Sequence, residues 1–158
     1  MCPQRYIGID YGEKRIGLAV ADEELMLAVP HRVFELSGNL EEDMEHLALI
    51  VKSEADMVII GLPLSKDGTE GPMAQRVRQF AEDLQHRIDL PVIFQDERMS
   101  TRANAGLLQG MPTEERKKLE DALAAAGILQ TWLDKRRASR QQQASPKNPG
   151  LGGLEPKR

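Results

Sequence analysis

The chain has 158 residues, of which 41% are hydrophobic and 29% charged, and its formal net charge is −4. This balance is typical of one globular domain with a substantial core, and the single cysteine, Cys2, excludes an intramolecular disulfide. No apolar run is long enough to cross a membrane and no signal-peptide layout is present, so we expect a cytoplasmic protein without a membrane partner.

The charge is distributed unevenly along the chain. Residues 1–134 contain 14 Lys and Arg against 24 Asp and Glu, whereas residues 135–158 contain 7 Lys and Arg and one Glu. The acidic body weakly disfavours general nucleic-acid binding and the basic end weakly favours it. Net charge therefore leaves the partner open.

The first part of the chain predicts three strands followed by a helix. Apolar residues 5–11 and 15–21 indicate two strands, and their short link implies an antiparallel hairpin. A third strand is expected over residues 26–35, and Pro30 places it at an edge or a bend. Apolar residues at helical spacing predict a helix from about Leu40 to Ser53.

Strands and helices alternate in the second part of the chain. Residues 56–62 form an apolar run that Pro63 ends, which indicates a buried central strand. The remaining expected elements are a helix to about Ile88, a strand over residues 92–95, a helix from Ser100 or Thr101 to about Gln109, and a helix from about Thr113 to Arg137.

This order predicts an α/β fold in which a mixed five-stranded sheet carries helices on both faces. Three antiparallel strands come first and parallel strands follow. We expect residues 1–137 to form the domain. Residues 138–158 are rich in Gln, Ser, Pro, Gly, Lys and Arg, which predicts a disordered basic tail.

Two carboxylates occupy positions where the apolar pattern predicts burial. Asp10 lies within the first expected strand, where a charge is costly unless it is paired or bound to metal. The alternative is an Asp that starts the turn at Gly12. Asp121 lies four residues before Ala125, on the apolar face of the last helix. The alternative is a first-turn acid that the helix dipole favours.

The third candidate follows the strand at residues 92–95, at an end of the sheet where ligands bind in open α/β folds. Side chains of the neighbours Asp96 and Glu97 diverge if the strand continues through them, so one can face a site while the other supports structure. We favour Glu97 for the site, although the pattern alone leaves this choice open.

Converging carboxylates are hard oxygen ligands suited to Mg²⁺ or Mn²⁺, and two such ions can support phosphodiester cleavage. Cations accompany each acid in the sequence: Lys14 and Arg15 follow the first, Arg98 and Arg102 follow the second, and residues 116–118 precede the third. Contacts to a phosphate backbone would require such cations. Local charge balance is the alternative reading.

Four motifs of the chain resemble the YqgF/RuvX family of pre-16S rRNA nucleases and Holliday junction resolvases. They are IGIDYGEKRIGLAVAD (7–22), GLPLSKDGTEGP (61–72), QDERMSTRAN (95–104) and EDALAAAGILQTWL (120–133). The resemblance covers roughly residues 5–137 and implies an RNase H-like fold. It also implies Asp10, Glu97 and Asp121 as the acidic catalytic and metal-binding positions, with residues 61–72 beside the cleft.

The resemblance implies a metal-dependent nuclease, a hydrolase acting on ester bonds. We rank maturation of the 5′ end of precursor 16S rRNA first and resolution of branched DNA second. The protein would act as a monomer or a homodimer, the latter suiting a two-fold junction. Two other classes stay open: an actin-like or sugar-kinase-like ATPase, and a non-catalytic nucleic-acid-binding assembly factor.

Overall fold

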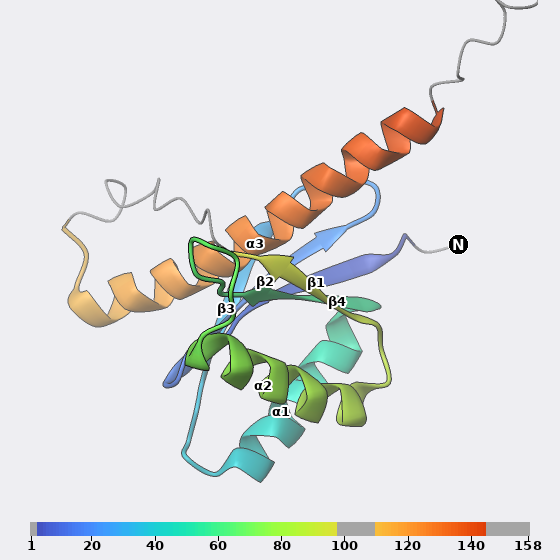
Figure 1. Ribbon diagram of the computed structural model, residues 1–158. Coiled ribbons are helices and arrows are strands. Elements are labelled where there is room, and N and C mark those ends of the chain that lie inside the picture. Colours follow the sequence, from blue (N-terminus) through green and yellow to red (C-terminus); the bar gives the residue numbers. More distant parts are fainter. Residues whose placement is uncertain (1–2, 98–109, 145–158) are drawn as a thin grey trace, which may run out of the picture.

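The computed structural model describes residues 3–97 and 110–144 (Figure 1). Its elements agree with the predicted order to within a few residues over most of this range. In chain order they are β1 (Arg5–Asp10), β2 (Arg15–Asp22), β3 (Val29–Glu35), α1 (Leu40–Glu54), β4 (Met57–Leu62), α2 (Pro72–Ile88), β5 (Val92–Asp96) and α3 (Thr113–Ala144). The helix expected between Ser100 and Gln109 lies outside the described residues.

The strands form one mixed sheet in the order β3-β2-β1-β4-β5. β1 and β2 pair antiparallel, as do β2 and β3, whereas β1 with β4 and β4 with β5 pair parallel. This confirms the predicted mixed five-stranded sheet. β3 lies at an edge, as Pro30 suggested, and its pairing with β2 shifts register next to that proline.

Helices cover both faces of the sheet, with α1 and α2 on one side and α3 on the other (Figure 1). Alternation of side chains along each strand divides the apolar residues between two cores. Ile7 and Ile9 of β1 belong to the core beneath α1 and α2. Tyr6 belongs to the core beneath α3, where its ring meets that of Trp132 edge to face at 5.1 Å. Every second residue of β1 after Tyr6 therefore faces α3, and this series ends at Asp10.

The end of α3 lies beyond the position expected from the sequence. The helix was expected to end near Arg137, and it continues to Ala144. Figure 1 shows this part of α3 projecting beyond the sheet. Arg136 stacks over Trp132 at 5.0 Å, and Arg140 pairs with Glu23 at 3.0 Å. The ion pair of Arg140 with Glu23 therefore links this part of the helix, which lacks an apolar stripe, to the body of the domain.

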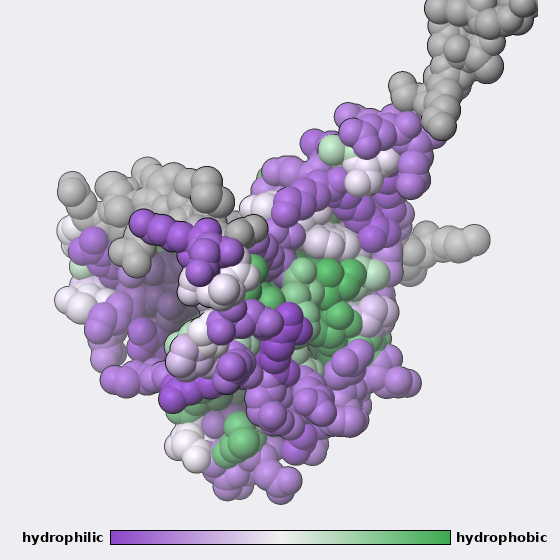
Figure 2. All heavy atoms as spheres, viewed as in Figure 1, coloured by the Kyte–Doolittle hydropathy of each residue, from purple (hydrophilic) through white to green (hydrophobic). Residues whose placement is uncertain are grey.

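Hydrophilic side chains dominate the face shown in Figure 2, and apolar surface gathers beside α3 near the sheet edge formed by β5. Within residues 3–97 and 110–144, no helix is long and apolar enough to span a membrane.

Candidate active site

Asp10 ends β1 in the middle of the sheet. It pairs in register with Gly17 of β2, and because Ile9 pairs with Ile60, its neighbour on β4 is Gly61. Its side chain points to the α3 face and is partly buried. A carboxylate therefore stands between two glycines, beneath a helix.

The two flanking glycines make room for the other two acids. A Cβ atom at Gly17 would collide with the backbone carbonyl oxygen of Asp121. A Cβ atom at Gly61 would lie 2.6 Å from the Cδ and Oε1 atoms of Glu97. Since side chains at both positions are absent, α3 and the Glu97 carboxyl group can approach Asp10 from either side. Sequence reasoning missed Gly17, for which a glycine inside an apolar strand was the available signal.

Glu97 continues the strand pairing of β5. Leu62 of β4 pairs with Asp96, and the backbone N–H of Glu97 donates to the carbonyl oxygen of Leu62 at 3.0 Å. Neighbouring side chains in an extended chain alternate, so Asp96 and Glu97 diverge, and Glu97 is the one that meets Gly61 on the α3 face. The geometry therefore brings Glu97 to Asp10.

Burial raises the pKa of both acids. It raises the pKa of Asp10 to about 6, with a further contribution from the negative charge of Asp121. Burial likewise raises the pKa of Glu97 to about 7, and the charges of Asp10 and Asp96 add to it. In the described part of the chain no cation pairs with Asp10 or Glu97. Two desolvated, uncompensated carboxyl groups favour a bound cation or a proton.

Asp121 lies in the third turn of α3, which begins at Thr113. The first-turn interpretation of this acid is therefore wrong; Glu114 and Glu115 occupy the first turn. The Nε atom of Arg15 donates a hydrogen bond to Oδ2 of Asp121 at 2.9 Å. These side chains are 28% and 30% exposed, so the pair lies at the rim of the site.

The acids fit a hard divalent cation in part. Asp10 and Glu97 offer oxygen donors whose charge no cation in residues 3–97 and 110–144 compensates. Among the residues that the structure describes, however, no three His, Cys, Asp or Glu side chains are placed to hold one ion together. The Asp121 carboxylate is paired with Arg15 instead. Asp121 is thus near the other two acids without completing a three-acid group.

The four cations proposed from the sequence to bind substrate lie in different environments or outside the described residues. Lys14 is exposed in the turn between β1 and β2, where a large ligand can reach it. Arg15 is engaged with Asp121. Arg98 and Arg102 lie outside the described residues.

The segment at residues 61–72 begins beside Asp10, at Gly61. Its own hydrogen bonds fold it back on itself: Ser65 N–H donates to the Thr69 carbonyl, and Thr69 Oγ1 donates to Asp67. Gly71 then caps the start of α2. These contacts make the segment a compact connection between β4 and α2.

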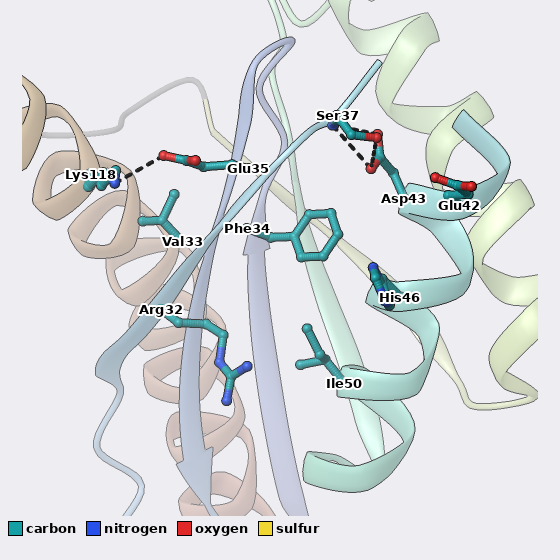
Figure 3. Close-up of a pocket in the computed structure, with 10 residues that line it drawn as sticks. All are labelled: Arg32, Val33, Phe34, Glu35, Ser37, Glu42, Asp43, His46, Ile50 and Lys118. Atoms are coloured by element: carbon teal, nitrogen blue, oxygen red, sulfur yellow. Dashed lines mark hydrogen bonds and ion pairs between the residues drawn. The ribbon is translucent and has the colours of Figure 1, made fainter. Parts of the chain in front are cut away.

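A hollow of about 520 Å³ lies away from these acids, between β3 and α1 (Figure 3). Two of its cations are paired, Lys118 with Glu35 at 3.0 Å and Arg32 with Glu54 at 3.1 Å. Asp43 accepts hydrogen bonds from Ser37 (Figure 3). Internal pairing of these charges distinguishes the hollow from the acidic site, and we assign no ligand to it.

Comparison with solved structures supports the fold. The chain is similar to Thermus thermophilus RuvC in complex with a Holliday junction substrate, with a TM-score of 0.52 at 16% identity over 85% of this chain and 96% of that one. It is equally similar to the fowlpox virus Holliday junction resolvase, with a TM-score of 0.52 at 15% identity over 83% and 99% of the two chains. These similarities confirm the expected RNase H-like fold.

Sequence comparison is more specific. A protein of Maridesulfovibrio salexigens named "Putative pre-16S rRNA nuclease" is 39% identical over 82% of this chain and 97% of its own length. One of the same name from Anaeromyxobacter sp. is 42% identical over 85% and 99%. The family model RuvX, described as Holliday junction resolvase, matches residues 4–135. The chain therefore belongs to the RuvX family.

Proposed function

We propose that this protein is a divalent-metal-dependent nuclease. Its active site, formed by Asp10, Glu97 and Asp121, would hydrolyse phosphodiester bonds of a nucleic acid. The observation that supports this most is the pair Asp10 and Glu97 on the α3 face of the sheet, both desolvated and without a paired cation among the residues that the structure describes. A buried charge of this kind is costly unless a cation or a proton joins it. A site that keeps two such groups side by side is suited to Mg²⁺ or Mn²⁺.

Asp10 and Glu97 would bind the metal, and Asp121 would join them from α3. When bound, the ion supplies positive charge next to the attacked phosphate. The protein contributes the arrangement of donors: the sheet fixes Asp10, the extended backbone fixes Glu97, and Gly17 fixes the position of Asp121. Lys14, exposed in the turn after Asp10, would contact the phosphate backbone.

Precursor 16S rRNA is our first candidate substrate. The relatives that this chain matches over nearly their whole length are named for a pre-16S rRNA nuclease activity. Cleavage would then take place in the cytoplasm during ribosome assembly. Branched DNA is the second candidate, supported by the description of the family model. One copy of the chain provides all three acids, so cutting a single RNA strand requires no second copy.

A cleavage assay with several substrates tests this proposal. Precursor 16S rRNA, generic single-stranded RNA and a four-way DNA junction are each incubated with the protein in Mg²⁺ and in Mn²⁺. We expect the fastest cleavage on the rRNA precursor and none in EDTA. Preference for the junction would favour the second candidate. Binding without cleavage on every substrate would favour an assembly factor, and ATP binding by calorimetry without cleavage would favour an ATPase.

A further inference from the structure

The backbone of Asp121 lies against the acidic site, but its carboxylate is bound by Arg15 and does not join the other two acids. The carbonyl oxygen of Asp121 rests against Gly17, the register partner of Asp10. Its charge is close enough to contribute to the raised pKa of Asp10. Yet Oδ2 is held by Arg15, and the described residues contain no three-acid group able to hold an ion. The Asp121 carboxylate is thus close to the other two acids but held by Arg15.

Arg15 reaches Asp121 because of its position on β2. It lies two residues before Gly17, and side chains two apart on a strand share a face. The guanidinium thus lies on the α3 face, where it pairs with the partly exposed carboxylate of Asp121. Asp10 and Glu97, whose pKa values burial raises, pair with no cation among the described residues.

We propose that Arg15 is a built-in competitor of the divalent metal for Asp121, a positioning residue that sets the metal affinity of the site. In the metal-free protein Arg15 compensates the charge of Asp121. Metal binding requires this ion pair to open, so that Asp121 can turn toward Asp10 and Glu97. The inference rests on the proposed metal site and adds to it how occupancy of the site is controlled.

The exchange is physically accessible. Both side chains are partly exposed, and ion pairs at such positions are weak enough to open when a stronger cation arrives. The released guanidinium does not become an isolated charge, because Glu35 and Glu114 also act on Arg15 electrostatically. Arginine keeps its charge at all working pH values, so the competition does not depend on its deprotonation.

Mn²⁺ binding tests the proposal without reference to cleavage. The electron paramagnetic resonance signal of free Mn²⁺ is followed during titration of the full chain, for the wild type and for Arg15→Gln. Lys14→Gln is the matched control, because it removes the same charge from the adjacent, exposed position. We expect Arg15→Gln to tighten Mn²⁺ binding by about three- to tenfold and Lys14→Gln to change it by less than about twofold.

Two further variants separate competition from a structural role. Arg15→Lys keeps the charge and should retain most of the wild-type affinity. In an Asp121→Asn background, where no carboxylate is left to compete for, Arg15→Gln should alter affinity no more than Lys14→Gln does. Thermal melts check that each variant is folded, and Arg15→Met, which also removes the charge, gives the comparison if Arg15→Gln does not fold.

The outcomes distinguish an error in the role of Arg15 from an error in the metal site itself. If wild type binds Mn²⁺ and Asp10→Asn does not, but Arg15→Gln binds no more tightly than Lys14→Gln, the competition is wrong and the metal site stands. An effect of Arg15→Gln that persists undiminished in the Asp121→Asn background overturns the competition as well. If wild type binds no Mn²⁺, or Asp10→Asn binds it equally well, the proposed metal site fails and the competition fails with it.

Discussion

Gly17 lies opposite Asp10 in the pairing of β1 with β2, and the backbone carbonyl oxygen of Asp121 occupies the space where a side chain at Gly17 would be. Two segments more than a hundred residues apart are brought together at this contact. The closest approach of α3 to the sheet thus coincides with the acidic site, and a substitution at Gly17 tests both together.

We expect Gly17→Ala to destabilise the protein by about 1–3 kcal/mol, because the added methyl group meets backbone that cannot turn aside. It should also weaken Mn²⁺ binding by displacing Asp121. Gly127→Ala is the control: Gly127 lies within α3 with nothing near its missing Cβ, so alanine should stabilise the protein by about 0.5–1 kcal/mol. Urea denaturation measures both, and equal effects at the two positions would contradict the packing described.

Gly61→Ala should affect Mn²⁺ binding more than it affects stability. The atoms nearest to the added methyl group belong to side-chain ends, those of Glu97 and Ile128, which can move. We therefore expect a smaller loss of stability than for Gly17→Ala but a marked loss of Mn²⁺ affinity, as Glu97 is pushed from Asp10. Titration of Mn²⁺ alongside urea denaturation checks this, and unchanged affinity would show that the space at Gly61 does not position Glu97.

The raised pKa values of Asp10 and Glu97 predict how stability depends on pH without metal. Since the pKa of Asp10 rises from 3.8 to about 6 and that of Glu97 from 4.5 to about 7, the folded protein holds protons that the unfolded chain has released. Both groups therefore destabilise the metal-free protein increasingly as pH rises from about 4 to about 7.

Asp10→Asn isolates the share of Asp10 in this dependence. In EDTA at pH 8 the variant should be more stable than wild type, by up to about 3 kcal/mol, and the difference should vanish near pH 4. Urea denaturation across this pH range measures it. A variant that is less stable than wild type at pH 8 would show that Asp10 is compensated in the folded protein.

The projecting end of α3 is predicted to depend on Arg136. Its guanidinium lies 5.0 Å from the ring centre of Trp132 and 5.7 Å from that of Tyr6. Arg136→Ala should cost about 0.5–1 kcal/mol, whereas Arg137→Ala, at an exposed neighbouring position, should change stability by less than about 0.5 kcal/mol. Thermal denaturation compares the two, and equal effects would contradict the anchoring role of Arg136.

Much of this fold could be predicted from the sequence because local patterns determine it. Apolar runs marked the strands, and the short link between residues 11 and 15 required a hairpin. Helical spacing placed Asp121 on the inward face of α3. The sequence left open whether Asp121 lies in the first turn, because the first residue of the helix was uncertain. The structure shows that the helix begins at Thr113, so Asp121 lies well beyond the first turn.

The remaining features depend on partners distant in the sequence. Arg15 finds Asp121 across 106 positions. The need for glycine at position 17 follows from the packing of α3 against it, which the sequence does not show. Residues 138–144 lack an apolar stripe, and contacts of Arg136 and Arg140 with the body stabilise the helix there. No local pattern contains such information.

Single-turnover cleavage of a precursor 16S rRNA fragment in Mn²⁺, by wild type and by Asp10→Asn, tests the central claim most directly. Asparagine preserves the shape of the side chain and removes only its charge, and the pH experiment above establishes that the variant folds. We expect Asp10→Asn to slow cleavage by about a hundredfold or more, because the deepest metal ligand is lost. Cleavage by folded Asp10→Asn at the wild-type rate would contradict the assignment of the acidic site.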